Sequence, residues 1–180
     1  SERSRGLGDV YKRQLLDCDA VAVDAGLTSM RLEELSQVAR ATAALGGSVL
    51  MQHYGQRVSI REKGRAGDLV TDADLAAEKV VLSGLSEATP EIPVLSEESG
   101  AQGDVSELCW CVDPLDGTTN FAHGYPFFAT SIGLLWRGLP ILGAVAVPFL
   151  EEVFWCCPGT GAFLHDLSLI HISEPTRPLR

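Results

Sequence analysis

A short apolar run that leads into acidic and glycine residues constrains this chain more than any other feature. Residues 108–112 are apolar and predict a buried strand, which should end at Asp113 because Pro114 fixes its own φ and has no backbone N–H. Asp116 follows three residues later, so both carboxylates can face one point if the chain turns. Gly117 then lets the backbone approach a ligand closely. The pattern predicts a strand end that carries two carboxylates.

These residue types allow two interpretations. Asp, Pro and Gly are common in turns, so an Asp-Pro-x-Asp-Gly sequence could simply connect two strands. Thr118 and Thr119 add hydroxyl groups directly after it. Two carboxylates, exposed amides and hydroxyls within so short a stretch are also a good site for a hard divalent cation and the phosphate that it holds.

The longer stretch Asp113-Pro-Leu-Asp-Gly-Thr-Thr-Asn-Phe121 resembles the signature of the inositol monophosphatase family. It matches the pattern Asp-Pro-hydrophobic-Asp-Gly-Thr-Thr/Ser-Asn-Phe at every position, and the resemblance extends over about residues 32–165. It implies Mg2+ as cofactor. The implied metal ligands are Glu97, Asp113 and the carbonyl of Leu115 for a first ion, and Asp113 and Asp116 for a second.

The resemblance also implies the residues that act on substrate. The amides of Gly117 and Thr118 would bind the phosphate. Thr71 predicts a helix N-cap, and acids in a first helical turn usually interact with the helix dipole. However, Asp68-Leu-Val-Thr-Asp-Ala-Asp74 is similar to the family's Asp-Leu-Val-Thr-x-x-Asp segment, which implies that Asp74 and Thr118 orient the attacking water. Lys63 aligns with a family lysine near the metal and phosphate.

Two adjacent acids, Glu97 and Glu98, follow a brief strand predicted at residues 94–95. Adjacent residues of an extended chain point in opposite directions, so at most one should face a site, and an acidic loop without context would simply be solvated. The family's Gly-Glu-Glu-Ser/Thr motif implies that Glu97 is the metal ligand and takes part in catalysis. Ser96 stands where the family usually has Gly.

The apolar patterns predict an α+β fold. Apolar residues recur at three- and four-residue intervals from Leu32 to about His53, and a second helix should follow Thr71. Consecutive, mostly antiparallel strands are predicted at residues 129–135, 141–148, 152–157 and 161–164. Helices before such a meander favour layered α+β architecture over a doubly wound parallel sheet. The resemblance implies the first half of a sugar-phosphatase-like fold.

The two ends differ from the rest of the chain. Residues 1–29 are expected to be a non-native or upstream segment and residues 168–180 a non-native tail, which leaves residues 30–167 as the N-terminal part of an inositol-monophosphatase-like domain. Members of the family continue into a second half that completes the second metal site. We therefore expect a truncated chain that is weakly active or inactive by itself.

Composition excludes several classes of function. A formal charge of -10 over 180 residues argues against a nucleic-acid or anionic-membrane partner. No apolar run reaches the roughly 18 residues that a membrane span needs. Five cysteines without a Cys-x-x-Cys pair suggest neither a disulfide framework nor a zinc site. We expect a cytoplasmic protein, or a plastid one in a photosynthetic eukaryote, and a homodimer for the intact parent.

The implied function is Mg2+-dependent hydrolysis of a phosphate monoester of a small polyol, most simply inositol 1-phosphate, by metal-activated water and with sensitivity to lithium. Related phosphatases act on histidinol phosphate, sugar phosphates or phosphoadenosine phosphate. Two alternatives stay open. A haloacid-dehalogenase phosphatase uses an Asp-x-Asp-Gly-Thr loop, one residue shorter than this one, with a covalent Asp nucleophile. An inactive cation- or phosphate-binding fragment is the other.

Overall fold

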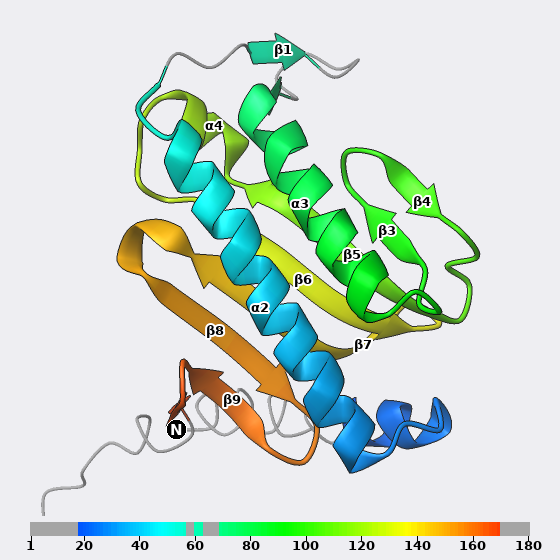
Figure 1. Ribbon diagram of the computed structural model, residues 1–180. Helices are drawn as coiled ribbons and strands as arrows, with labels where there is room; N and C mark the ends of the chain where they lie inside the picture. The colour runs from blue at the N-terminus through cyan, green and yellow to red at the C-terminus, as the bar shows by residue number, and fades with distance from the viewer. Residues whose placement is uncertain (1–17, 57–59, 63–68, 170–180) are drawn as a thin grey trace, which may run out of the picture.

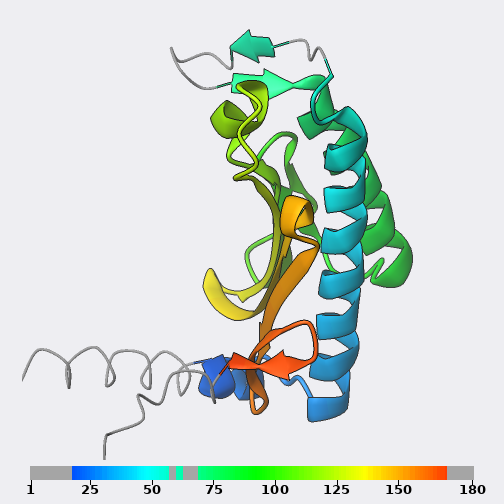
Figure 2. The same ribbon diagram turned by 90° about the vertical axis from the view of Figure 1, so that its left-hand side faces the viewer.

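The computed structural model describes residues 18–56, 60–62 and 69–169, so Lys63 and Asp68 lie outside the described residues. Two long helices, α2 (Ser29–His53) and α3 (Asp72–Ala88), lie side by side over one face of a large sheet (Figure 1). The view at right angles shows both helices on the same side of that sheet (Figure 2). The α+β layering predicted from the sequence is confirmed.

The large sheet has eight strands in the order β10-β9-β8-β7-β6-β5-β3-β4. Their bounds are β3 (Val94–Ser96), β4 (Gly100–Gln102), β5 (Leu108–Asp116), β6 (Ala129–Trp136), β7 (Leu139–Val147), β8 (Glu152–Cys157), β9 (Gly161–Leu164) and β10 (Leu167–Ser168). Strands β5 to β10 form the predicted antiparallel meander, and only the β3–β5 pair is parallel. The sheet is therefore mixed but mostly antiparallel, as expected.

Four smaller elements also belong to the fold. Strands β1 (Ile60–Glu62) and β2 (Leu69–Thr71) form a separate antiparallel pair that leads into α3. A one-turn helix, α4 (Thr118–Ala122), follows β5, and the 3-10 helix η1 (Pro148–Leu150) joins β7 to β8. Across the part of the chain that the structure describes, no helix has the length and apolar character to cross a membrane.

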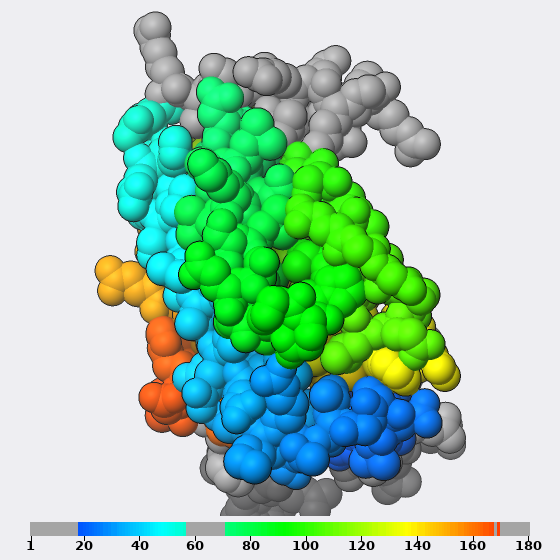
Figure 3. All heavy atoms as spheres, turned by 45° about the vertical axis from the view of Figure 1, so that its right-hand side comes forward, coloured from blue at the N-terminus to red at the C-terminus, as the bar shows by residue number. Residues whose placement is uncertain are grey.

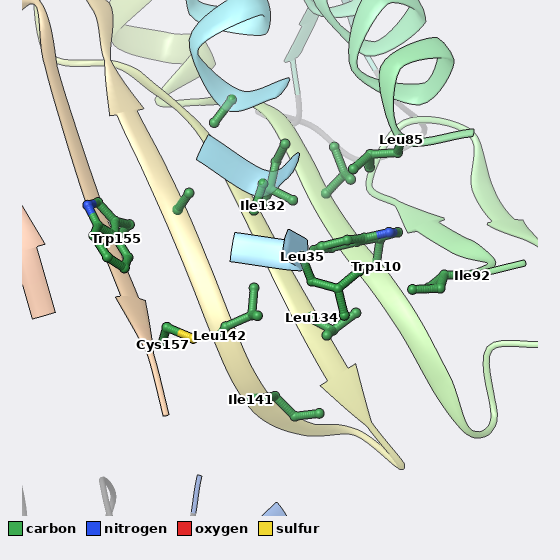
Figure 4. Close-up of a cluster of buried hydrophobic side chains, with 14 of the residues drawn as sticks. Leu35, Leu85, Ile92, Trp110, Ile132, Leu134, Ile141, Leu142, Trp155 and Cys157 are labelled. Carbon is green, nitrogen blue, oxygen red and sulfur yellow. The ribbon is translucent and has the colours of Figure 1, made fainter. Parts of the chain in front are cut away.

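The main core lies between the helices and the sheet. Trp110 of β5 is fully buried and lies beside Leu35 of α2 and Leu134 of β6 (Figure 4). Its indole Nε1 donates to the hydroxyl of Thr89 over 2.9 Å, which satisfies the one polar atom of this side chain. Ala22 belongs to the same core. It lies in the described part of residues 1–29, the segment expected to be non-native or upstream sequence. The proposed boundary at residue 30 stays a prediction.

Close packing of α2 depends on glycine. A Cβ at Gly46 would lie 2.8 Å from Val81 of α3 and 2.9 Å from Thr130 of β6. The helix can therefore approach both neighbours only because this position has no side chain. This contact lies in the C-terminal half of α2, and α3 itself also packs against β5, the strand that carries Asp113.

One prediction about β5 is wrong. The strand does not end at Asp113 but continues through Pro114 to Asp116, with a shift in its register against β6 between Asp113 and Asp116. Proline is tolerated in a strand at such an irregularity because the partner strand needs no N–H there. The carbonyl of Pro114 accepts a bond of 3.0 Å from the hydroxyl of Thr130, so the interrupted ladder leaves this group paired.

Candidate active site

The first part of the candidate site is the loop where β5 meets α4. The amide of Leu115 donates to Asp113 Oδ1 over 3.1 Å, which fixes one oxygen of that carboxylate. The Thr118 hydroxyl lies 3.0 Å from the Leu115 carbonyl and 3.2 Å from Asp74 Oδ1. Because a hydroxyl carries one proton, it can donate to only one of these acceptors at a time. The loop thus connects the carboxylates of Asp113 and Asp74 through two residues, Leu115 and Thr118.

Asp74 is buried at the N-terminus of α3, with only 1% of its surface exposed. Its Oδ2 accepts from the amide of Thr71 over 2.8 Å and from the hydroxyl of the same residue over 2.5 Å. Thr71 in turn accepts from the amide of Asp74, which completes a capping box. The predicted N-cap is confirmed, and Asp74 also reaches Thr118, which a residue that only caps a helix need not do.

Gly117 allows the chain to turn between β5 and α4. Its φ of 91° is left-handed, and a Cβ there would lie 2.8 Å from the carbonyl oxygen of Phe127. Beneath the turn, Phe121 and Phe128 pack edge to face, with ring centroids 4.9 Å apart. The aromatic residues after the signature therefore support the loop as core, while Phe127 itself is 73% exposed.

The second part of the site is the turn between β3 and β4. Ser96 pairs with Gly100, so Glu97, Glu98 and Ser99 form a three-residue connection. The amide of Glu97 donates to the Val112 carbonyl over 3.0 Å, which ties the turn to β5. The Glu97 side chain is hydrogen-bonded to that of Asp113. The predicted ligand residue is therefore placed beside the signature loop.

Two other carboxylates act on Asp113 at this site. The pKa of Asp113 is raised to about 7, first by burial and then by the negative charges of Glu97 and Asp116 and by its hydrogen bond with Glu97. The amide of Leu115 acts in the opposite direction. A divalent cation would relieve this repulsion, and carboxylate and carbonyl oxygens are the ligands that Mg2+ prefers.

The arrangement is not a ready-made metal cage. Among residues 18–56, 60–62 and 69–169, no three His, Cys, Asp or Glu side chains are grouped closely enough to hold an ion. A hollow of about 490 Å³ borders Glu97 and Asp113, and it is also lined by Cys111 and Ser131. The donor chemistry therefore suits Mg2+, and open space adjoins two of the proposed ligands.

Two residues at the site were not singled out from the sequence. Cys111 lies two residues before Asp113 on β5, and its pKa is raised by burial and by the charges of Asp113 and Glu97. Glu78 is a buried carboxylate on α3 that accepts from Ser96 and Ser99, at the two ends of the Glu97 turn. Its spacing of four residues from Asp74, on the same helical face, was the available signal.

Comparison with known proteins gives a consistent result. The model of the inositol monophosphatase family matches residues 31–179. Over 135 residues the chain is 43% identical to an inositol-1-monophosphatase of Synechocystis, and this match covers 74% of the chain and 47% of the relative. It is 38% identical to a fructose-1,6-bisphosphatase/inositol-1-monophosphatase of Aquifex aeolicus, with 74% and 51% covered. The chain spans about half the length of these curated relatives.

Solved structures agree with these sequence relatives. The extragenic suppressor protein suhB from Bartonella henselae superimposes with a TM-score of 0.67 at 41% identity, covering 73% of this chain and 51% of that one. An inositol monophosphatase from Anabaena gives a TM-score of 0.66 at 38% identity, covering 76% and 49%. The helix-on-sheet arrangement around the candidate site is therefore shared with these proteins.

Proposed function

We propose, from the premise that this chain belongs to the inositol monophosphatase family, that it carries the Mg2+-binding part of a phosphatase for small polyol phosphates. The observation that carries the proposal is that Asp113 is partly buried near Glu97 and Asp116, so that burial first and then these two negative charges raise its pKa to about 7. Such a cluster is unfavourable without a cation and suits a site that binds one. Membership of this family also argues against a haloacid-dehalogenase mechanism with a covalent Asp nucleophile.

The proposed ligands all supply oxygen. Glu97, Asp113 and the Leu115 carbonyl would hold a first Mg2+, and Asp113 with Asp116 a second. The Leu115 carbonyl lies within hydrogen-bond distance of Thr118, but a carbonyl oxygen has two lone pairs, so it can serve both. An all-oxygen set favours Mg2+ over Zn2+. When bound, Mg2+ supplies positive charge for the phosphate and lowers the pKa of water.

Asp74 and Thr118 are proposed to orient the attacking water. Both oxygens of Asp74 are engaged, Oδ2 by Thr71 and Oδ1 by the Thr118 hydroxyl. The Thr118 oxygen can accept a hydrogen bond from water only while its own proton points to Asp74 or to Leu115. Because Asp74 is buried, its carboxylate is held in place to accept the proton of the Thr118 hydroxyl. The pair would therefore hold the water in one orientation for in-line attack.

The phosphate is proposed to lie against the backbone at Gly117 and Thr118. The left-handed turn at Gly117 carries the chain from β5 into α4, where the first backbone amides have no partner within the helix. Lys63, outside the described residues, is proposed as a further contact. Inositol 1-phosphate is the first substrate to test, and fructose 1,6-bisphosphate is the second because the Aquifex relative's name includes both activities.

The cellular location, the assembly state and the inhibition by lithium are part of the same proposal. A relative from Arabidopsis, 45% identical over 148 residues, is named a chloroplastic phosphatase. We therefore propose the cytoplasm or a plastid as the location, a homodimer for the intact parent, and inhibition by lithium.

The test is phosphate release with and without Mg2+. The chain is assayed alone and together with the separately expressed half of the Synechocystis relative that it does not match. Release that requires Mg2+ and is lost in Asp113→Asn would support the proposal. Release that survives exhaustive chelation would overturn the role of Mg2+. Mg2+ binding without turnover in either format would favour the inactive cation-binding fragment.

A further inference from the structure

Glu78 lies within α3, and only 7% of its surface is exposed. A buried carboxylate is costly unless hydrogen bonds replace its water. Its Oε1 accepts from the Ser96 hydroxyl over 2.5 Å and from the Ser99 amide over 2.9 Å. These two donors flank Glu97 and Glu98. Glu78 therefore spans the base of the turn that carries the proposed metal ligand.

The turn has few other attachments. Gly100 has a φ of 77°, which lets the three-residue connection return into β4. Glu97 and Ser99 are both exposed, so apolar packing does not hold them. The amide of Glu97 is tied to the Val112 carbonyl on one side, and Glu78 holds the opposite side. Loss of Glu78 would remove two of these bonds and leave the bond of Glu97 to β5 and a bond of 3.1 Å that the Gln102 side chain donates to the Ser99 hydroxyl.

Glu78 and Asp74 lie four residues apart on α3 and thus on one helical face. Like charges at this spacing destabilise a helix, so two buried acids need a compensating gain. Each accepts hydrogen bonds from a different part of the site. Asp74 binds Thr118 of the signature loop, and Glu78 binds the Glu97 turn. Figure 3 shows the surface of α3 lying against the residues of the β3–β4 hairpin.

We propose that Glu78 is a positioning residue that, together with Asp74, makes α3 a two-point clamp on the site. One carboxylate fixes the Thr118 loop and the other fixes the Glu97 turn, so the helix sets how far Glu97 lies from Asp113. This inference rests on the proposed function, because it concerns the placing of Glu97 as a metal ligand. Ser96, where the family usually has Gly, supplies one of the two donors.

The test compares four variants of the 180-residue chain by Mg2+ titration in a calorimeter. Glu78→Ala removes the acceptor and should weaken Mg2+ binding by about 10- to 100-fold, the usual effect of losing a group that orients a ligand. Glu78→Gln keeps a carbonyl oxygen for both donors and should stay within about threefold of the parent chain. Glu87→Ala removes an exposed acid from the same helix and controls for charge.

The fourth variant controls for stability. Thr89→Val breaks the bond to the Trp110 indole at the far end of α3, so it should lower the unfolding midpoint without changing Mg2+ affinity. Hydrogen exchange gives a readout that needs no metal. The Ser99 amide should exchange at least tenfold faster in Glu78→Ala and at the parent rate in Glu87→Ala, because only the first loses the acceptor of that amide.

The outcomes separate the two proposals. If the parent chain binds Mg2+ and Glu78→Ala binds it equally well, the clamp is wrong and the proposed function stands. If the parent chain binds no Mg2+, the proposed metal site is wrong, and exchange at Ser99 then decides whether Glu78 positions the turn. Unchanged exchange at Ser99 in Glu78→Ala would overturn the clamp in either case.

Discussion

The signature loop and the Glu97 turn bring carboxylates to the same place, but they are held in different ways. The loop, residues 113–118, is fixed largely by its own residues: Leu115 binds Asp113, Thr118 approaches Leu115, and Gly117 makes the turn. The turn, residues 97–99, is fixed by groups distant in the sequence, Glu78 on α3 and Val112 on β5. The contacts that hold the loop lie within its own short motif, whereas the partners that hold the turn lie outside the turn's motif.

The largest expected effect is at Asp113, where the loop and the turn meet. Asp113→Asn removes the carboxylate shared by both proposed ions and should weaken Mg2+ binding by about 100-fold or more, with loss of turnover. The same change should raise the free energy of unfolding in chelator, by up to about 1 kcal/mol after solvent screening, because repulsion from Glu97 and Asp116 is relieved. Calorimetric titration and denaturant unfolding measure the two effects.

Glu87→Gln, an exposed acid on α3, serves as the control and should change neither quantity. An Asp113→Asn protein that is less stable than the parent in chelator would contradict the crowding of carboxylates on which the proposed function depends.

Gly117→Ala tests how strictly the loop determines its own shape. The substitution combines an unfavourable left-handed φ with a contact of 2.8 Å to the Phe127 carbonyl, so it should destabilise the chain by about 2–4 kcal/mol. Gly124 has a similar φ of 73° but nothing within 4 Å of a Cβ, so Gly124→Ala should cost only about 1–2 kcal/mol. The difference in unfolding free energy between the two variants, measured with denaturant, separates the cost of the close contact to Phe127 from the cost of the left-handed φ. Equal losses would mean that Gly117 is required for its backbone angle alone.

Much of the fold could be predicted from the sequence because its signals are local. The three- and four-residue spacing of apolar residues located α2, and Thr71 with Asp74 marked the start of α3. The turns at residues 137–138 and 158–159 separated the strands of the meander. The course of β5 past Pro114 could not be predicted, because it depends on Thr130 of the neighbouring strand.

The site divides in the same way. The contacts that Asp113, Leu115 and Thr118 make with one another lie within six residues, so a motif could suggest them. Glu78 acts on residues 18 and 21 positions away, and only the folded chain brings them together. Nothing in the sequence indicates which residues Glu78 contacts. Its spacing of four residues from Asp74 indicates only that the two acids share one face of the helix.

A smaller effect distinguishes the two acids of the turn. Glu97→Gln should weaken Mg2+ binding by about tenfold, because Glu97 faces Asp113 and would lose a charged ligand. Glu98→Gln should change it by less than about twofold, since Glu97 and Asp116, and not Glu98, are the acids whose charges raise the pKa of Asp113. Titration of both variants under identical salt provides the comparison. Equal losses would show that the wrong carboxylate of the pair has been assigned.

The smallest effect concerns pH, and it reports on the loop and the turn together. The folded chain holds the Asp113 proton up to a pKa of about 7, whereas an unfolded Asp releases it near pH 3.9, about the usual value. Between these values the folded state binds more protons, so the free energy of unfolding should fall as pH rises from about 4 to about 7 in chelator. Half-exposure of the carboxyl limits the change to about 1 kcal/mol.

Other groups also titrate in this range, so the informative quantity is the difference between the parent chain and Asp113→Asn. Glu97→Gln should reduce that difference because it removes the first of the two neighbouring charges, and saturating Mg2+ should reduce it by neutralising them. Denaturant unfolding at several pH values provides the measurement. A difference that persists unchanged in Glu97→Gln would mean that the turn does not contribute to the electrostatics of the loop.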